Sequence, residues 1–300
     1  MGIENIVDGW QYKLTVLHIY MRYVENTFRK FECSGHAQSM LARLALDWVF
    51  FPHLENFQTD RHTGALMTDL SLFPITRKWP ARHPERIQLY SLPTPNGVKV
   101  SIMLEETGLP YEPHLVSFDS NDQTSPEFLS LNPNNKIPAI IDPNGPDGKP
   151  LPLFESGAIL IYLADKSERF MPHDRAGRYE TIQWLMFQMG GIGPMFGQLG
   201  FFNKFAGKDY EDKRPRDRYV AESKRLLAVL NQRLAQRQWI MGDTYTIADI
   251  ATFPWVRNLI GFYEAGDLVG IADFPHVTRA LAAFLARPAV AKGLTIPQRG

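Results

Sequence analysis

A turn that carries a hydroxyl and an amide separates a short apolar segment from a helix-like one, at Thr94-Pro-Asn-Gly97. Thr94 is a good N-cap residue and Pro95 suits the first helical position, so the turn predicts a helix N-terminus. Such a terminus presents unpaired N–H groups and partial positive charge, which stabilise an anion such as a thiolate. The Thr94 hydroxyl and the Asn96 amide can add two donors there. The alternative is that Thr94 only caps the helix.

A proline opens a predicted strand in the sequence Asn135-Lys-Ile-Pro138. A cis bond before Pro138 would hold the preceding backbone open at the edge of a sheet. A peptide ligand could then pair with the N–H and C=O groups of Ile137 as an added strand. The alternative is an ordinary trans proline at the first residue of a strand.

A second strand-to-helix turn carries a carboxylate and a hydroxyl, at Glu155-Ser156-Gly157. Ser156 and the adjacent N–H groups suit a ligand carboxylate, while the Glu155 carboxylate suits an ammonium group. The head group of a zwitterionic amino acid presents this combination. The alternative places Ser156 as a simple N-cap and Glu155 on the surface.

The basic run Lys213-Arg-Pro-Arg-Asp-Arg218 is typical of a solvated helix start. One of its members, pointing into a cleft, could hold a further carboxylate. These four segments agree on one prediction, a site for an anionic peptide-like ligand with a stabilised thiolate.

Other chemistries lack their sequence patterns. The eight histidines have no metal-ligand spacing, and the single cysteine, Cys33, cannot form an intramolecular disulfide. We therefore predict no metal, a cytoplasmic location, and no redox chemistry through a protein dithiol. Cys33 and His36 lie close in sequence, but nearness in sequence does not place a base against a nucleophile, so a free thiol is the favoured interpretation. No nucleophile elbow, phosphate loop or dinucleotide fingerprint is present.

The composition is that of an ordinary globular protein, with 300 residues, 44% hydrophobic and 21% charged. This length favours two domains. The 32 basic residues balance the 32 acidic ones, which argues against nucleic acid or an anionic membrane as partner. No apolar run approaches the length of a membrane span, and Glu4 and Asp8 stand where a signal peptide would be basic.

The elements that must position the candidate residues follow a β-α-β-α-β-β-α order. Strands are predicted at 87–90, 111–118, 137–141 and 151–154, with helices beginning near Thr94, Ser125 and Ser156. The first two strands are predicted to be parallel because a helix lies between them. Beyond residue 170 the pattern is helical, at 179–189, 218–236, 247–262 and 275–285.

Three regions result: an N-terminal extension of doubtful function (1–85), a small α/β domain (86–170) and an all-helical domain (176–290). In the helical domain, Thr246-Ile-Ala-Asp249 is interpreted as a structural capping box with Asp in the Glu position.

From about Arg86 to Pro288 these features resemble the glutathione transferase family. The α/β domain resembles its thioredoxin-like glutathione domain, and Thr246–Asp249 its helical-domain capping motif. More specific strings resemble the bacterial nu-class branch, whose members reduce disulfides with glutathione and lack a catalytic cysteine. These are Thr94-Pro-Asn-Gly97, Pro133-Asn-Asn-Lys-Ile-Pro-Ala139, Phe154-Glu-Ser-Gly-Ala158 and Gly190-Gly-Ile-Gly-Pro194.

The resemblance implies roles for particular residues. Thr94 and Asn96 would hold the glutathione sulfur as the catalytic pair. The glutathione-binding residues would be Asn96, Gln123, Ile137, Glu155, Ser156 and Arg218. Ile137 would act through its backbone beside a cis Pro138, and Arg218 would reach in from the helical domain. Glutathione would be the bound co-substrate and a small disulfide the substrate of a homodimeric enzyme, with an open pocket near Met195–Phe202 admitting it.

The expected function is therefore a glutathione-dependent disulfide reductase. Two alternatives stay open: a transferase or peroxidase acting on small electrophiles or hydroperoxides, and a non-catalytic protein of the same fold that binds partners. Residues 1–66 are a departure from the family pattern, and Met67 makes a plausible start. We expect these residues to be an upstream read-through.

Overall fold

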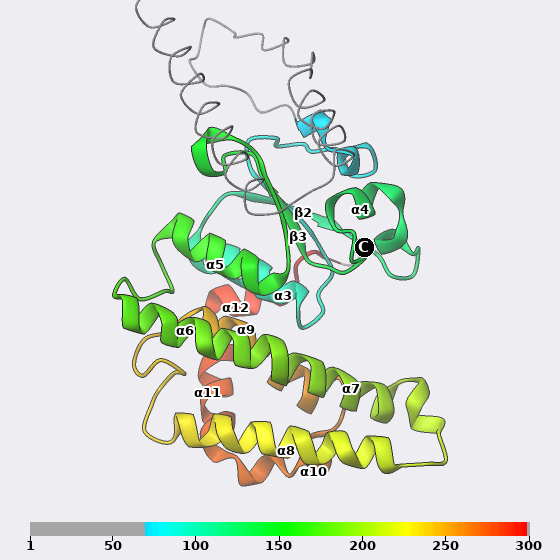
Figure 1. Cartoon of the computed structure of the whole chain (residues 1–300), viewed down its shortest axis with the longest axis vertical. Helices are drawn as coiled ribbons and strands as arrows, with labels where there is room; N and C mark the ends of the chain where they lie inside the picture. Colours follow the sequence, from blue (N-terminus) through cyan, green and yellow to red (C-terminus); the bar gives the residue numbers. More distant parts are fainter. Residues whose placement is uncertain (1–69, 299–300) are drawn as a thin grey trace, which may run out of the picture. The chain divides into compact units, whose positions relative to one another are not determined.

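The computed structural model describes residues 70–298. The chain divides after Leu66, and all described residues belong to the unit Met67–Gly300. They form a small α/β half followed by a helical half (Figure 1). The segment of Cys33 and His36, and the predicted extension up to residue 69, lie outside the described residues.

One mixed sheet forms the centre of the first half, with strand order β2-β1-β3-β4. Its strands are β1 (Ile87–Ser91), β2 (Tyr111–Leu115), β3 (Ala139–Asp142) and β4 (Leu151–Phe154). Leu89 pairs with Pro113 in parallel and with Ile140 in antiparallel register, so the predicted parallel pairing of the first two strands is confirmed. β2 and β3 are shorter than predicted, since β2 ends at Leu115 and β3 begins at Ala139.

The sheet separates two apolar cores, as the alternation of side chains along a strand requires. Ile87 and Leu89 of β1 face a large core that continues into the helical half, whereas Tyr90 faces a smaller core with Phe128. Helices α3 (Gly97–Thr107) and α5 (Ser156–Ser167) cover the first face, and α4 (Pro126–Leu131) contributes to the second. In Figure 1, α3 and α5 lie between the sheet and the helical half.

Local sequence explains where these helices begin and end. Gly108 ends α3 in the left-handed region with φ 73°, a conformation that favours glycine. Ser125 caps α4 by accepting a hydrogen bond from the Phe128 N–H at 3.3 Å, and Pro126 occupies the first helical position. The helices therefore follow the predicted β-α-β-α-β-β-α order.

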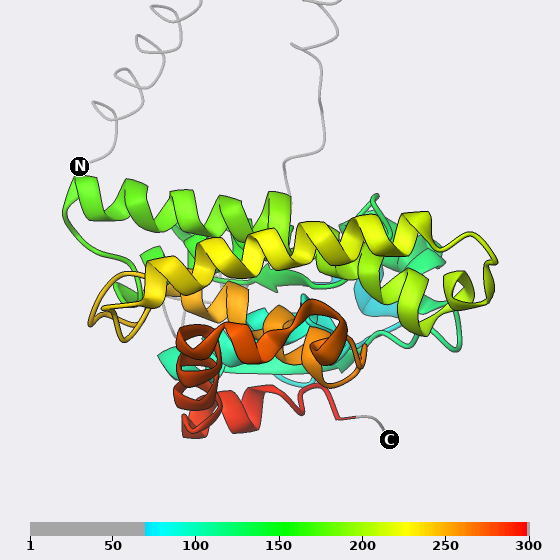
Figure 2. The same cartoon turned by 90° about the horizontal axis from the view of Figure 1, so that it is seen from below.

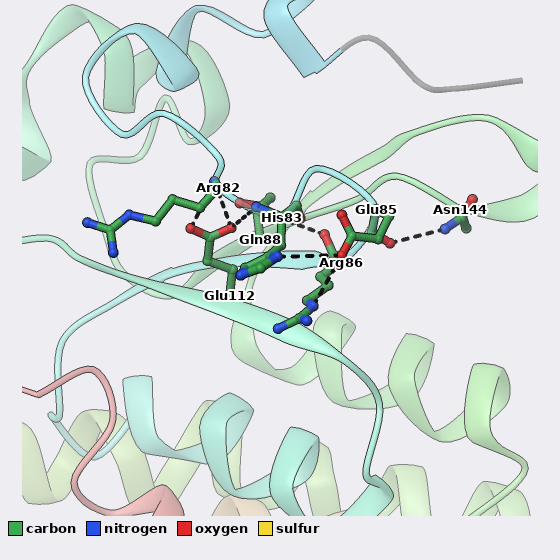
Figure 3. A network of polar contacts seen from close by, with 7 residues as sticks. All are labelled: Arg82, His83, Glu85, Arg86, Gln88, Glu112 and Asn144. Carbon is green, nitrogen blue, oxygen red and sulfur yellow. Dashed lines mark hydrogen bonds and ion pairs between the residues drawn. The ribbon is translucent and has the colours of Figure 1, made fainter. Parts of the chain in front are cut away.

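Residues 70–86 pack against this sheet, although sequence analysis assigns those up to residue 85 to the extension. They include two 3₁₀ turns, η1 (Leu70–Leu72) and η2 (Pro74–Arg77). The Trp79 indole donates to the Leu115 carbonyl at 2.9 Å. The Glu112 carboxylate accepts hydrogen bonds from the N–H groups of Arg82 and His83, at the edge strand β2 (Figure 3). These contacts anchor the segment that leads into β1.

The second half is helical throughout its described length, apart from isolated bridges near Trp239. It contains α6 (Arg175–Phe187), a π-helical turn η5 (Gln188–Ile192), α7 (Gly193–Lys204), η6 (Ala206–Asp209), α8 (Arg214–Leu234), α9 (Ile247–Ile260), α10 (Gly266–Val269), η7 (Ile271–Asp273), α11 (Pro275–Leu285) and α12 (Pro288–Gly293). Figure 2 shows α8 alongside α7. The predicted fold class, α/β followed by all-α, is confirmed. No helix in the described range is long and apolar enough to cross a membrane.

Helix α9 is the centre of this half and is buried along almost its whole length. The capping box at its start is present: the Thr246 hydroxyl accepts from the Ala248 N–H at 3.3 Å, and the Asp249 carboxylate accepts from the Thr246 N–H at 3.0 Å. Burial raises the pKa of Asp249 to about 7, against the opposing effect of its hydrogen bonds. This box fixes the start of the helix that carries one wall of the site.

Candidate functional site

The turn before α3 holds Thr94 in a capping role. Its hydroxyl oxygen accepts a hydrogen bond from the Gly97 N–H at 3.3 Å, and its carbonyl accepts from the Val98 N–H at 3.0 Å. The helix itself begins at Gly97 with Asn96 as its N-cap residue, so the prediction of Thr94 as N-cap and Pro95 as the first helical residue is wrong by two residues. A side chain at Gly97 would overlap the carbonyl oxygen of Leu92, so only glycine fits this close approach. No described residue accepts a hydrogen bond from the Thr94 hydroxyl, so its proton can be donated to a ligand.

Asn96 is held by a residue from the other half of the unit. The Trp255 indole N–H donates to Asn96 Oδ1 at 2.9 Å. An indole nitrogen is only a donor, so this bond fixes which end of the amide is oxygen. The amide nitrogen, with two N–H donors, has no hydrogen-bond partner among the described residues. It is therefore available to a ligand.

Thr94, Asn96 and Ile137 border the same cleft, of about 880 Å³. The sheet half contributes Leu92, Pro93, Thr94, Pro95, Asn96, Phe118, Lys136 and Ile137, and the helical half Phe205, Trp255, Arg257, Asn258, Gly261, Phe262 and Tyr263. Donors from the turn thus lie opposite a largely aromatic wall. The segment Met195–Phe202, near which the open pocket was expected, belongs to α7 and does not itself line the cleft, although Gly200 packs closely against the lining residue Tyr263.

The peptide bond between Ile137 and Pro138 is cis, as the family resemblance implied. Ile137 comes two residues before β3, and its side chain is largely buried. At the start of β3, Ala139 pairs with Phe154 at the end of β4. This pairing brings the turn that follows β4 beside the cis proline.

That turn contains Glu155 and Ser156. Glu155 has φ 71° and ψ 111°, a backbone conformation that is strained for a residue with a side chain, and its carboxylate is exposed. Ser156 is buried, and its oxygen accepts a hydrogen bond from the ammonium of Lys99 at 3.3 Å. Lys99 follows Asn96 by three residues, so α3 links the two turns. Neither Glu155 nor Ser156 lines the 880 Å³ cleft.

Gln123 is half-buried, whereas Arg218 is exposed. The Gln123 Oε1 atom is buried without a hydrogen-bond partner among the described residues, so it presents an acceptor that a ligand N–H would satisfy. Gln123 is not part of the cleft lining. Arg218 is exposed near the start of α8, one turn before Glu222, and is not part of the cleft lining. The roles assigned to both residues stay predictions.

Sequence reasoning missed Trp255 and Lys99. Trp255 is 159 residues from Asn96, and one tryptophan in an apolar helix gives no sign of its partner. Lys99 did leave a signal, because it interrupts a run that is otherwise apolar or small, Gly97–Leu104. A lysine on a helix buried all round must have internal partners.

In residues 70–298, no group of His, Cys, Asp and Glu side chains is placed to hold a metal ion. At the cleft, the amide donors of Asn96, which no described residue uses, and the cleft volume suit a glutathione-like peptide. Gln123 offers its acceptor outside the cleft lining.

Fold and site together define a thioredoxin-like domain joined to a helical domain. Residues 85–165 match the family described as "Glutathione S-transferase, N-terminal domain", and residues 215–287 the one described as "Glutathione S-transferase, C-terminal domain". The chain belongs to the glutathione S-transferase family.

Two relatives from Escherichia coli (strain K12) are named disulfide-bond oxidoreductases. YfcG is 43% identical over 71% of this chain and 97% of its own length, and YghU is 42% identical over 71% of this chain and 74% of its own.

Solved structures of glutathione transferases are also similar to this chain. A glutathione transferase from Burkholderia graminis, with two glutathione molecules bound per subunit, is 81% identical, covers 81% of this chain and 99% of its own, and has a TM-score of 0.78. One from Pseudomonas putida, with one glutathione disulfide bound per subunit, is 72% identical, covers 77% of this chain and 100% of its own, and has a TM-score of 0.76.

Proposed function

We propose that the protein is a glutathione-dependent disulfide reductase that uses the thiolate of bound glutathione and no protein cysteine. The observation that carries the proposal is the pair of donors at the turn before α3. The Trp255 bond to Asn96 Oδ1 leaves the Asn96 amide nitrogen for the sulfur, and the Thr94 hydroxyl proton is also free. The names of YfcG and YghU, and the glutathione disulfide in the Pseudomonas putida structure, support the same activity.

The energetic demand on this turn is modest. A free thiol has a pKa of about 8.5, so little of it is thiolate at neutral pH. Lowering that pKa by about two units requires about 2.7 kcal/mol of preferential thiolate stabilisation. Two hydrogen bonds to the charged sulfur at a helix N-terminus supply that amount.

The reaction balances with two glutathione molecules. The first thiolate attacks one sulfur of the disulfide, which breaks the S–S bond and releases the other half as a thiolate that takes up a proton. A second glutathione thiolate then attacks the glutathione sulfur of the mixed disulfide. The products are glutathione disulfide and two thiols. Asn96 and Thr94 hold the attacking sulfur.

The remaining contacts extend the proposal along the peptide. Ile137 offers its backbone beside the cis proline, and Gln123 offers the unpaired Oε1. Glu155 and Ser156 take the ammonium and carboxylate of the γ-glutamyl head. Arg218, which lies in the helical half, binds a further carboxylate of the ligand.

The test is a pair of assays on the purified protein with glutathione. One follows the reduction of bis(2-hydroxyethyl) disulfide, coupled to glutathione reductase, and the other follows conjugation to an aryl halide. Strong reduction with weak conjugation is the expected result. No activity in either assay would contradict an enzymatic function and favour a binding protein.

The aromatic wall of the cleft favours conjugation as a second candidate function. Phe205, Trp255 and Phe262 present apolar surface opposite the Thr94 turn. A hydrophobic electrophile packed there would lie near the same sulfur. Conjugation that is stronger than disulfide reduction in the paired assays would establish this second function as the main one.

We further propose a cytoplasmic homodimer. Reduction by glutathione needs a compartment that keeps glutathione reduced. Tyr179 and Met186 are exposed on α6 and lie seven residues apart, on one face of the helix. Light scattering coupled to size exclusion should give twice the mass of the chain, and a monomeric mass would contradict the dimer.

A further inference from the structure

Lys99 is fully buried beneath the turn that begins α5. Among residues 70–298 it is the only lysine or arginine in the buried class, with 0% of its surface exposed. It lies on α3 three residues after Asn96, and the mechanism proposed above makes no use of it. Burying an ammonium group is costly unless a partner balances its charge.

The partners of Lys99 are all neutral. Its ammonium donates to Gln188 Oε1 at 2.6 Å, to Ser156 Oγ at 3.3 Å and to Met189 Sδ at 3.4 Å. These three acceptors use all three of its N–H donors. Lys99 forms no ion pair with any described residue, and Glu155 acts on it only through its field.

The surroundings are built to hold this arrangement. Gln188 and Met189 belong to the π-helical turn η5, which joins α6 to α7. A Cβ added at Gly157 would lie 3.2 Å from Met189, and one added at Gly193 would lie 2.8 Å from the Gln188 amide nitrogen. Glycines therefore leave the space that these two side chains occupy. The ammonium is fixed from both halves of the unit.

Lys99 determines the direction of the hydrogen bonds that the Ser156 hydroxyl can form. An ammonium group is only a donor, so Ser156 Oγ must accept from it. The hydroxyl proton of Ser156 is donated to Met189 Sδ at 3.7 Å, a weak acceptor that a ligand carboxylate beside the N–H groups of the first turn of α5 would replace. A ligand carboxylate at that point would meet these donors and would lie one side chain away from the buried charge.

We propose that Lys99 is a positioning residue for the ligand carboxylate at the start of α5, acting through Ser156, and that this carboxylate supplies the counter-charge that the buried ammonium lacks. The inference rests on the proposed binding of the γ-glutamyl head at Glu155 and Ser156. It adds Lys99 to that site and couples ligand binding to the uptake of a proton.

The linkage follows from the state of Lys99 before the ligand arrives. Burial lowers its pKa to about 7, while the Glu155 carboxylate works in the opposite direction. Near neutral pH, part of the population is therefore uncharged. A second carboxylate close by raises the pKa, so ligand binding takes up a proton.

Charged groups on the other elements packed against α3 either have partners or are exposed. They are Lys292 and Arg287 on or beside α12, paired with Glu105 and Glu106 of α3, and Asp249 in the capping box of α9. Arg257 of α9 is exposed at the cleft and β1 carries no charged residue. On α5, Asp165 pairs with Arg178 and Lys166 with Asp142. Among these groups, Lys99 is the buried one whose charge no ion pair balances.

The test is titration calorimetry of the full chain with S-methylglutathione, which has no thiol proton to release. Binding heats at about pH 7.5 in phosphate and in Tris, two buffers of different ionisation enthalpy, give the number of protons taken up. We expect on the order of half a proton per site for the wild type. We expect no uptake, and affinity at least about tenfold weaker, for Lys99→Met.

Ser101→Ala is the matched control. Ser101 lies on the same helix, and its buried hydroxyl donates to the Gly293 carbonyl at 2.6 Å, away from α5. This variant should keep the proton uptake of the wild type. If Lys99→Met fails to fold, the wild type alone remains decisive, because its uptake must disappear well below pH 7, where Lys99 is already charged.

The possible outcomes distinguish a failure of the role proposed for Lys99 from a failure of the proposed function. Binding of S-methylglutathione without proton uptake, or with equal uptake and affinity in Lys99→Met, overturns the role of Lys99 and leaves the proposed function intact. An absence of binding to the wild type overturns both.

Discussion

Asn96 shows how one side chain can be given a direction by another. Its oxygen is held by the Trp255 indole N–H, so its nitrogen is left for a ligand. Thr94 is arranged in the same way, since its oxygen accepts from the Gly97 N–H and its proton is free. In both residues the internal hydrogen bond uses the acceptor and leaves a donor, which is the kind of group that a thiolate needs.

Thr94→Ala and Asn96→Ala should each raise the pKa of the thiol of bound glutathione. The reason is the loss of one hydrogen bond to the charged sulfur, worth about 1.5–3 kcal/mol, or roughly one to two pKa units. The thiolate absorbance in the ultraviolet, followed against pH, measures this. Disulfide turnover near neutral pH should fall by about tenfold or more.

Thermal unfolding of the same variants gives the control. Loss of the Thr94 cap costs about 1 kcal/mol, and Asn96→Ala frees a tryptophan N–H at similar cost, so both chains should remain folded. A thiol pKa equal to that of the wild type in both folded variants would move the chemistry to another part of the cleft.

Lys99 should make the free energy of unfolding depend on pH. Burial lowers its pKa from 10.5 to about 7, so between these values the unfolded chain binds more protons than the folded one. The contribution of Lys99 to stability therefore rises with pH across this window, by a few kcal/mol, and its cost is fully present below about pH 7. Urea unfolding of the wild type between about pH 7 and 10 should show this rise.

Lys99→Met removes the titrating group and fills a similar volume, so its stability should change less over the same window and exceed that of the wild type near pH 7. A parallel rise in both chains would show that other groups cause the pH dependence.

Part of this site can be predicted from the sequence, and the rest cannot. Thr94, Asn96 and Ile137 stand in short local motifs, and the structure brings these three to one cleft. Trp255 could not be assigned, because its role depends on how two halves of the chain pack. Lys99 was visible only as an exception in an apolar helix, and its partners come from later in the chain.

At the scale of elements, local signals predicted the sheet half more completely than the helical half. The alternation of strand, helix and strand predicts the parallel pairing of β1 and β2, whereas no sequence pattern predicts α7. Its sequence holds Gly193, Gly197 and Gly200, which disfavour a helix. A Cβ at Gly200 would lie 2.5 Å from the Tyr263 ring, so packing requires a small residue there and overrides propensity.

The contact of α12 with α3 is close enough to test by one substitution. A Cβ at Gly293 would lie 2.6 Å from the Ile102 Cα, which is backbone and cannot move aside. Gly293→Ala should therefore lower the free energy of unfolding by about 1–3 kcal/mol, measured in urea. Gly190→Ala is the matched control, because a Cβ there meets nothing within 4 Å. Equal stability of the two variants would contradict the close approach.

At the scale of the whole molecule, the cleft takes its described walls from residues 92–263. A chain that begins at Met67 should therefore keep the disulfide reductase activity and glutathione affinity of the full chain, within about twofold. Steady-state kinetics and calorimetry of both chains measure this. Markedly weaker binding or turnover by the shorter chain would show that residues 1–66 contribute to the site.

The hydrogen bond between Asn96 and Trp255 joins the sheet half to the helical half at the cleft. If the helical half separated from the sheet, the Thr94 turn could persist, but the Asn96 amide would turn freely and one wall of the cleft would be gone. Under the proposed function, a partly unfolded chain therefore does not activate glutathione. Reactivity is confined to the fully assembled molecule, and damage that loosens the two halves abolishes the activity before the sheet itself is lost.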